Sequence, residues 1–252
     1  RRLAEATRAV SISSDPEPLP ESGPTEVRAA LRAFNVMQGR IREGVRDRTQ
    51  VLAAISHDLQ TPLTRLRLRL EHVSDPELRD RLASDVVATQ RLVREGLDLA
   101  RAGESREPFS NVDLDSLISS LVEDNAEFGA PVTFTGGCGA TVRVKPDALA
   151  RCLGNLIDNA LKYGGDADVT CARHGNMIVV AVRDHGPGIA PDAIATMFQP
   201  FQRGDNSRSR TTGGTGIGLT IARAQATTFG GTIALTNCAD GGLLATVSFP
   251  AA

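Results

Sequence analysis

His57 is the residue of this chain best suited to nucleophilic chemistry. Asp58 follows it directly, and Thr61 lies four positions further on. On a helix, His57 and Thr61 would share one face. An imidazole next to a carboxylate can exchange protons near neutral pH, whereas the plain alternative is a helical histidine without chemistry. The apolar residues around it recur at three- and four-residue spacing, which predicts a helix: Val51, Leu52, Ile55, Leu59, Leu63, Leu66 and Leu70.

A second candidate group contains two amides and an ammonium. Asn155 and Asn159 are four positions apart, Lys162 comes three positions later, and Tyr163 follows it. On a helix these polar groups would share a face. Amide oxygens suit a hard cation that keeps several waters, and a lysine supplies a point charge for phosphates. The group therefore fits a magnesium–triphosphate, with Asn159 and Asn155 as the metal candidates; the alternative is an exposed polar face.

A third group follows a strongly apolar run. Asp184 is followed by Gly186, Gly188 and Ile189. The two glycines allow a tight turn and a close approach to a flat ligand. A carboxylate at the end of a strand could accept a hydrogen bond from an exocyclic amine such as the adenine N6 group. The alternative is an ordinary turn, since Asp and Gly are common in turns.

Two further segments complete the candidates. Met197–Asn206 contains two phenylalanines that could anchor a polar loop, together with Arg203 and Gly204, and residues 207–214 have the composition of a mobile lid. The segment 213–219 is glycine-rich and is expected to open a helix, where backbone N–H groups favour phosphate. Its candidate binding residues are Thr215, Gly216, Ile217, Gly218 and Leu219.

Composition excludes several classes of protein. The chain has 41% hydrophobic residues, 4% aromatic residues and a net charge of −2, so the balance argues against a dedicated nucleic-acid binder. No apolar run approaches the roughly 18 residues that span a bilayer. Four cysteines form no Cys-x-x-Cys pair, which favours a reducing cytosol without disulfides or structural zinc. Cys152 and Cys171 lie in apolar patterns and are expected to pack as small hydrophobes.

Helices are expected to carry the histidine. We predict a short helix over 1–10, a proline-rich connector over 11–24, a continuous helix from about residue 25 past His57, and another from Pro76 to about Ala102. Pro62 should bend the long helix just after His57. Two antiparallel helices cannot bury their apolar faces alone. Pairing with a second copy into a four-helix bundle predicts a homodimer.

The remainder mixes helices and strands. We predict helices over 111–128, 146–163 and 216–229, and strands over 132–135, 141–144, 167–173, 177–184, 231–237 and 242–249. Elements in this order favour an α/β sandwich with a mixed sheet under helices. That architecture would hold the three C-terminal candidate groups on one scaffold.

The ordered motifs resemble known boxes. Those of the C-terminal part resemble the N, G1, F and G2 boxes of the ATP-binding domain shared by histidine kinases, gyrases, chaperones and mismatch-repair ATPases. The run from Ser56 to Arg65 resembles the phospho-acceptor box of sensor histidine kinases, most closely the osmosensor type, and Gly23–Val27 with Phe34–Met37 resembles a HAMP domain. The resemblance implies a multidomain chain of dimeric helical bundles followed by the α/β sandwich. Its expected domains are 1–46 (HAMP), 47–106 (dimerisation and phosphotransfer) and 107–252 (ATP binding).

The resemblance also implies roles for the residues. Asn159 would bind Mg²⁺, Asn155 would face the phosphates, and Asp184 would read the adenine of ATP. Arg203 and the backbone of 215–219 would hold the phosphates. His57 would accept the phosphoryl group, with Asp58 orienting it and Thr61 assisting dephosphorylation of the partner.

The resemblance further implies partners and a location. A response regulator would receive the phosphoryl group on an aspartate, and nucleic acid would not be bound directly. A missing N-terminal part would carry transmembrane helices, so the full protein would lie at the cytoplasmic face of the bacterial inner membrane and this fragment would be soluble. Two residues depart from the pattern: Gln60 stands where arginine is usual, which puts phosphotransfer or phosphatase rates in doubt, and Ile217 where leucine is common.

Three other interpretations remain open at this point. A chaperone- or topoisomerase-type ATPase would use a glutamate where Asn155 stands and would lack the histidine box. A degenerate kinase acting as a dimeric scaffold is kept open by Gln60. A helical partner-binding module with an unrelated α/β domain would leave the order of the motifs unexplained.

Overall fold

The computed structural model describes residues 18–101, 107–127, 129–202 and 215–251. The chain divides into two compact units, Arg1–Glu104 and Ser105–Ala252. The predicted helix over 1–10, most of the connector, and the lid with Arg203 and Gly204 lie outside the described residues.

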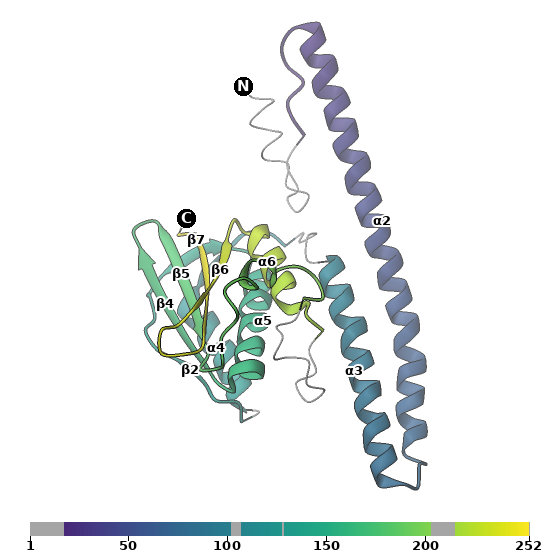
Figure 1. Cartoon of the computed structure of the whole chain (residues 1–252). Helices are drawn as coiled ribbons and strands as arrows, with labels where there is room; N and C mark the ends of the chain where they lie inside the picture. Colours follow the sequence, from purple (N-terminus) through teal and green to yellow (C-terminus); the bar gives the residue numbers. More distant parts are fainter. Residues whose placement is uncertain (1–17, 102–106, 128, 203–214, 252) are drawn as a thin grey trace. The chain divides into compact units, whose positions relative to one another are not determined.

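The first unit is a helical hairpin of α2 (Thr25–Leu70) and α3 (Pro76–Arg101) (Figure 1). Pro62 lies inside α2 without ending it, as do Gly39 and Gly44. The predicted continuous helix is therefore confirmed. Asp75 begins α3 by accepting hydrogen bonds from the backbone N–H groups of Glu77 (3.0 Å) and Leu78 (3.2 Å), which is N-capping by a short acidic side chain.

The hairpin has almost no core of its own. Among the side chains described in the hairpin, only that of Gln38 is buried. Large apolar side chains remain a third or more exposed along both helices: Val27, Val36, Met37, Ile41, Val51, Leu52, Ile55, Leu59, Leu66, Leu68, Leu78, Leu82, Val87 and Leu92. One copy of the hairpin thus leaves its apolar stripe in water.

The second unit is an α/β sandwich, as predicted. Its five-stranded sheet has the order β2-β4-β5-β7-β6, in which β2 and β4 are parallel and the other pairs antiparallel. Helices α4, α5 and α6 pack along one face of this sheet (Figure 1). The strands are β2 (Val132–Phe134), β4 (Ala167–His174), β5 (Met177–Arg183), β6 (Thr232–Asn237) and β7 (Leu243–Pro250), and the helices α4 (Leu114–Glu127), α5 (Pro146–Gly164) and α6 (Gly218–Thr228).

The core lies between the sheet and the helices. On β5, Ile178, Val180 and Val182 are at most 2% exposed, while the intervening residues are partly exposed. This alternation is the period-two pattern of a strand covered on one face. Within the core, the rings of Phe229 and Phe249 make an edge-to-face contact with their centres 5.5 Å apart. Every residue of the buried cluster belongs to this unit.

The prediction of a helix from Asn111 was wrong at its start. Residues Ser110–Asp113 form strand β1, which pairs antiparallel with β3 (Thr141–Val144). The helix begins only at Leu114, because the Asp113 carboxylate accepts the N–H of Ser116 at 2.9 Å. A capping aspartate takes an extended conformation, which fits the end of a strand better than a helix interior.

The long helices are not membrane spans. Across the described residues, none of the helices combines the length and the apolar character needed to cross a bilayer.

Candidate nucleotide-binding site

The glycine-rich segment and the two asparagines come together between α5 and α6. A Cβ placed on Gly218 would lie 3.4 Å from Oδ1 of Asn155 and 3.5 Å from both amide atoms of Asn159. The first turn of α6 therefore abuts the polar face of α5. Backbone N–H groups at a helix start lack partners within the helix and attract anions. Two amides and a helix N-terminus thus face one another.

Asn159 carries an unpaired amide group. Its Nδ2 is buried and has no hydrogen-bond partner among the described residues. Leaving a buried donor unpaired costs about 1–3 kcal/mol, and buried polar groups are otherwise almost always paired. Asn155 differs, because its Nδ2 donates to the carbonyl of Arg151 at 2.8 Å. A phosphate oxygen suits this unpaired N–H donor, whereas Oδ1 of the same amide is the atom that suits a cation.

Asp184 is held rigidly at the end of β5. It is 7% exposed, and its Oδ1 accepts the N–H of Gly186 at 2.9 Å and that of Leu243 at 3.1 Å. Burying a polar oxygen costs free energy unless it is hydrogen-bonded, so these two bonds stabilise the side chain in this position. Because both bonds fall on one oxygen, Oδ2 is left as an acceptor for a further donor.

Three backbone segments meet tightly around Asp184. A Cβ on Gly242 would lie 1.9 Å from the Asp184 carbonyl oxygen, one on Gly164 would lie 2.5 Å from Asp184 Cβ, and one on Gly186 would lie 2.7 Å from the carbonyl oxygen of Tyr163. Only glycine fits such approaches. They fix the turn after β5 against the end of α5 and the β6–β7 turn.

Two further contacts hold this turn, and sequence reasoning missed both. Asn237 accepts the N–H of Ile189 at 2.9 Å and donates to its carbonyl at 2.6 Å. Asp166 accepts the N–H of His185 at 3.1 Å and lies 2.8 Å from its Nδ1. Nothing in the spacing of the sequence points to these partners, because each pairs the turn with a different element.

Phe201 and Gly216, which flank the undescribed residues 203–214, are hydrogen-bonded to each other. Phe201 donates its N–H to the carbonyl of Gly216 at 3.0 Å. Gly216 has a φ of +74° and would place a Cβ 2.5 Å from the Gln202 carbonyl oxygen. Phe201 has a φ of 64°, unusual for a residue with a bulky side chain. Backbone strain of this kind persists where surrounding contacts impose it.

Comparison with known proteins decides the family. A HAMP domain matches residues 1–43, a His Kinase A (phospho-acceptor) domain matches 47–105, and a histidine kinase-, DNA gyrase B- and HSP90-like ATPase domain matches 144–252. The chain is 37% identical over 250 residues to the sensor histidine kinase GtrS of Pseudomonas aeruginosa. The aligned region covers 99% of this chain and 52% of GtrS.

The chain belongs to the sensor histidine kinases. It is also 33% identical over 226 residues to the sensor protein RstB of Escherichia coli K12, covering 86% of this chain and 52% of RstB. The chain spans about half the length of these curated relatives. In fold it resembles full-length ShkA, crystallised with AMPPNP, with a TM-score of 0.64, 23% identity, and coverage of 79% of this chain and 45% of ShkA.

The histidine kinase boxes predicted from sequence are distributed over both units. His57, Asp58 and Thr61 lie within α2 of the hairpin. In the ATPase unit, Asn155 and Asn159 lie against Gly218, while Asp184 lies against Gly164 at the end of α5, the helix that carries both asparagines. Lys162 lies with its Nζ 5.0 Å from the centre of the Tyr163 ring, in the last turn of α5.

Proposed function

We propose that this chain is the part of a membrane sensor kinase that phosphorylates itself on His57 with ATP. The phosphoryl group then passes to an aspartate of a response regulator. One observation carries the proposal: the first turn of α6 abuts Asn155 and the unpaired amide of Asn159, in a chain that also matches a phospho-acceptor domain.

In this proposal ATP lies between α5, the turn after β5 and the start of α6. Asp184 accepts a hydrogen bond from the adenine 6-amino group through its remaining oxygen, and Asn155 faces the phosphates. Mg²⁺, held by Asn159, would neutralise charge on the triphosphate. Phosphate contacts are completed by side chains and by the backbone at the helix start: Lys162, Arg203 and Thr215–Leu219. Tyr163, Gly186, Gly188 and Ile189 complete the proposed contacts to the nucleotide, and Gly204 is a further candidate outside the described residues.

The transfer itself needs little covalent machinery from the ATP-binding unit. An imidazole nitrogen of His57 attacks the γ-phosphorus while the bond to the ADP oxygen breaks, so positioning and charge neutralisation account for most of the rate. Asp58 orients the ring or takes its proton. Asn155 is an amide and cannot act as a general base for water, so hydrolysis of the kind that uses a carboxylate at this position is disfavoured.

Further parts of the proposal concern the whole protein. Thr61, one turn beyond His57, positions a water for dephosphorylation of the regulator. Two hairpins pair through their apolar stripes into a homodimer. The full protein is anchored in the membrane, with its kinase part at the cytoplasmic face. The match to a HAMP domain and the sensor-kinase relatives support this part of the proposal.

Labelling with γ-³²P-ATP tests the proposal. His57→Ala should lose at least 100-fold of the incorporated label because the acceptor is gone, while ATP affinity stays within about twofold since the nucleotide contacts are untouched. The matched control is His72→Ala in the same unit, which should label normally. Label retained by His57→Ala would refute the assignment.

Thr61→Ala tests whether dephosphorylation of the regulator can be lost separately from autophosphorylation. Autophosphorylation should persist while dephosphorylation of a phosphorylated regulator slows about tenfold or more, because the water loses its positioning group. Equal losses in both assays would remove Thr61 from this role.

A further inference from the structure

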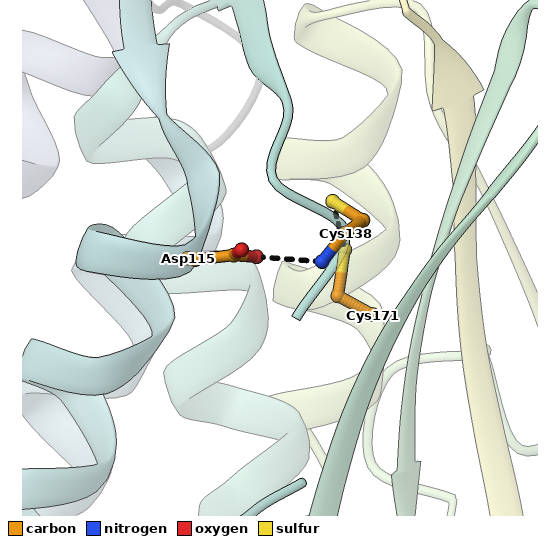
Figure 2. Close-up of side chains that lie close together, drawn as sticks. All are labelled: Asp115, Cys138 and Cys171. Atoms are coloured by element: carbon orange, nitrogen blue, oxygen red, sulfur yellow. Dashed lines mark hydrogen bonds between the residues drawn. The ribbon is translucent and has the colours of Figure 1, made fainter. Parts of the chain in front are cut away.

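Two cysteines that are far apart in sequence meet within the ATP-binding unit, close to Asp115 (Figure 2). Cys138 lies between β2 and β3, and Cys171 lies on β4. Their Sγ atoms are 2.7 Å apart, and both are free thiols. The nucleotide-site residues described above do not include either cysteine. The separation of 33 residues explains why Cys-x-x-Cys spacing gave no sign of the pair.

The surrounding backbone holds the sulfurs together. Asp115, in the first turn of α4, accepts the N–H of Cys138 at 2.9 Å and that of Gly139 at 2.7 Å. Cys171 donates its own N–H to the carbonyl of Gly136 at 3.0 Å. Hydrogen bonds thus hold the loop and the strand on both sides of the thiol pair. Gly136 and Gly139 have positive φ values, and a glycine-rich segment of this kind can adjust its backbone by a fraction of an ångström.

The geometry fits a covalent bond better than a metal ion. A disulfide needs a sulfur separation of about 2.05 Å, only a short approach from the observed one. Two thiolates on a tetrahedral zinc, each about 2.3 Å from the metal, would lie roughly 3.8 Å apart. Asp115, the third group near enough to be a ligand, already accepts a backbone hydrogen bond on each carboxylate oxygen.

We propose that Cys138 and Cys171 are a reversible oxidation site, forming an intramolecular disulfide across the β2–β3 loop and β4. With a peroxide as oxidant, the Cys138 thiolate attacks one peroxide oxygen and becomes a sulfenic acid as the second oxygen leaves as water. Cys171 then displaces the sulfenic hydroxyl, also as water. Two thiols and one peroxide give one disulfide and two waters, and a dithiol reverses the reaction.

The order of the two steps follows from burial. Cys138 is half-buried in the loop, whereas Cys171 is 5% exposed. Burial raises the pKa of the Cys171 thiol above its ordinary value, with Cys138 adding to the effect. Cys171 is therefore the resolving thiol, and the accessible Cys138 meets the oxidant.

Mass spectrometry of the whole chain tests the site. After limited hydrogen peroxide, maleimide labelling should count two fewer thiols, digestion should yield a peptide linking Cys138 to Cys171, and dithiothreitol should restore both thiols. The cross-link closes a long loop, so the thermal midpoint of the oxidised unit should rise by roughly 5–10 °C.

The variants make the test specific. Cys138→Ser and Cys171→Ala should each abolish the cross-link, whereas Cys238→Ser, at another half-buried free cysteine, should leave it intact. Cross-links to Cys152 or Cys238 instead, or no loss of thiols at peroxide levels that oxidise Cys238, would overturn the proposal. Stoichiometric Zn²⁺ binding lost in Cys138→Ser would also overturn it, in favour of a metal site.

Discussion

The side-chain amides of Asn155 and Asn159 differ in their hydrogen bonding, and this difference bears on ligand binding. Nδ2 of Asn155 donates a hydrogen bond to the backbone carbonyl of Arg151, whereas the buried Nδ2 of Asn159 has no partner among the described residues. A fold optimised only for stability would pair or remove that group. The unpaired amide is therefore best explained by a ligand that completes it.

Asn159→Ala tests this explanation. ATP affinity should fall at least about tenfold, because the metal and phosphate contacts are lost. The free energy of unfolding should not fall by more than about 1 kcal/mol, since no existing hydrogen bond is broken and an unpaired buried donor is removed. Isothermal titration and urea unfolding measure the two effects. Asn125→Ala, which removes an amide bonded to its own helix, should leave ATP affinity unchanged; a marked loss of stability in Asn159→Ala with normal affinity would contradict the account.

Alanine substitution at the neighbouring glycines Gly241 and Gly242 tests the tight packing around Asp184. Gly241 and Gly242 have φ values of +96° and +89°, so alanine is strained at both, by about 1–2 kcal/mol. A Cβ meets nothing within 4 Å at Gly241 but the Asp184 carbonyl oxygen at Gly242. Gly242→Ala should therefore destabilise the unit by about 2 kcal/mol more than Gly241→Ala and also weaken ATP binding, as urea unfolding and titration would show. Equal effects would contradict the steric explanation.

At the scale of elements, the apolar periodicity and the capping signals predicted most of the fold. The start of α3 at Asp75–Pro76 and the strand before Asp184 were predicted from local pattern. The strand β1 was missed, because four residues of mixed character carry no period and are defined only by pairing with β3. The contacts of Asn237 and of the two cysteines were missed for the same reason: they depend on tertiary approach.

The start of α4 gives a pH-dependent prediction. The hydrogen bonds to Ser116 lower the pKa of the Asp113 carboxyl from its ordinary value of 3.8. A carboxyl whose pKa is lower in the folded chain adds stability above the unfolded pKa and loses it as pH falls through the folded one. Asp113→Ala should therefore lower the urea midpoint at pH 7, and the difference from wild type should shrink at about pH 2.

The control for this prediction lies on the same helix. Asp124 is exposed near the far end of α4, and Asp124→Ala should not reproduce the pH-dependent loss. A deficit of Asp113→Ala that is the same at both pH values would show that the carboxylate charge is not the cause.

The two units differ in what they can do alone. The α/β unit holds the whole buried cluster, whereas the hairpin exposes its apolar stripe. Burying a leucine contributes about 1.5–3 kcal/mol, so pairing of two hairpins would recover a large free energy. The apolar stripe was predicted from the sequence by its periodicity and is confirmed, whereas its pairing with a second copy stays a prediction.

Leu66→Glu tests the pairing. Leu66 is 47% exposed on α2, and a charge there should disfavour burial against a second copy, raising the dimer dissociation constant at least about 100-fold. Light scattering after size exclusion measures the mass. Thr64→Glu adds the same charge two residues away and should remain dimeric; a wild-type chain that is monomeric at micromolar concentration would contradict the dimer.

Chemical identification of the phosphorylated residue distinguishes His57 from every other acceptor in the chain. After incubation with Mg-ATP, the phosphate on the chain should be lost in acid, survive alkali, and map by tandem mass spectrometry to the peptide containing His57. Phosphate that survives acid, or that maps to a residue other than His57, would contradict the account.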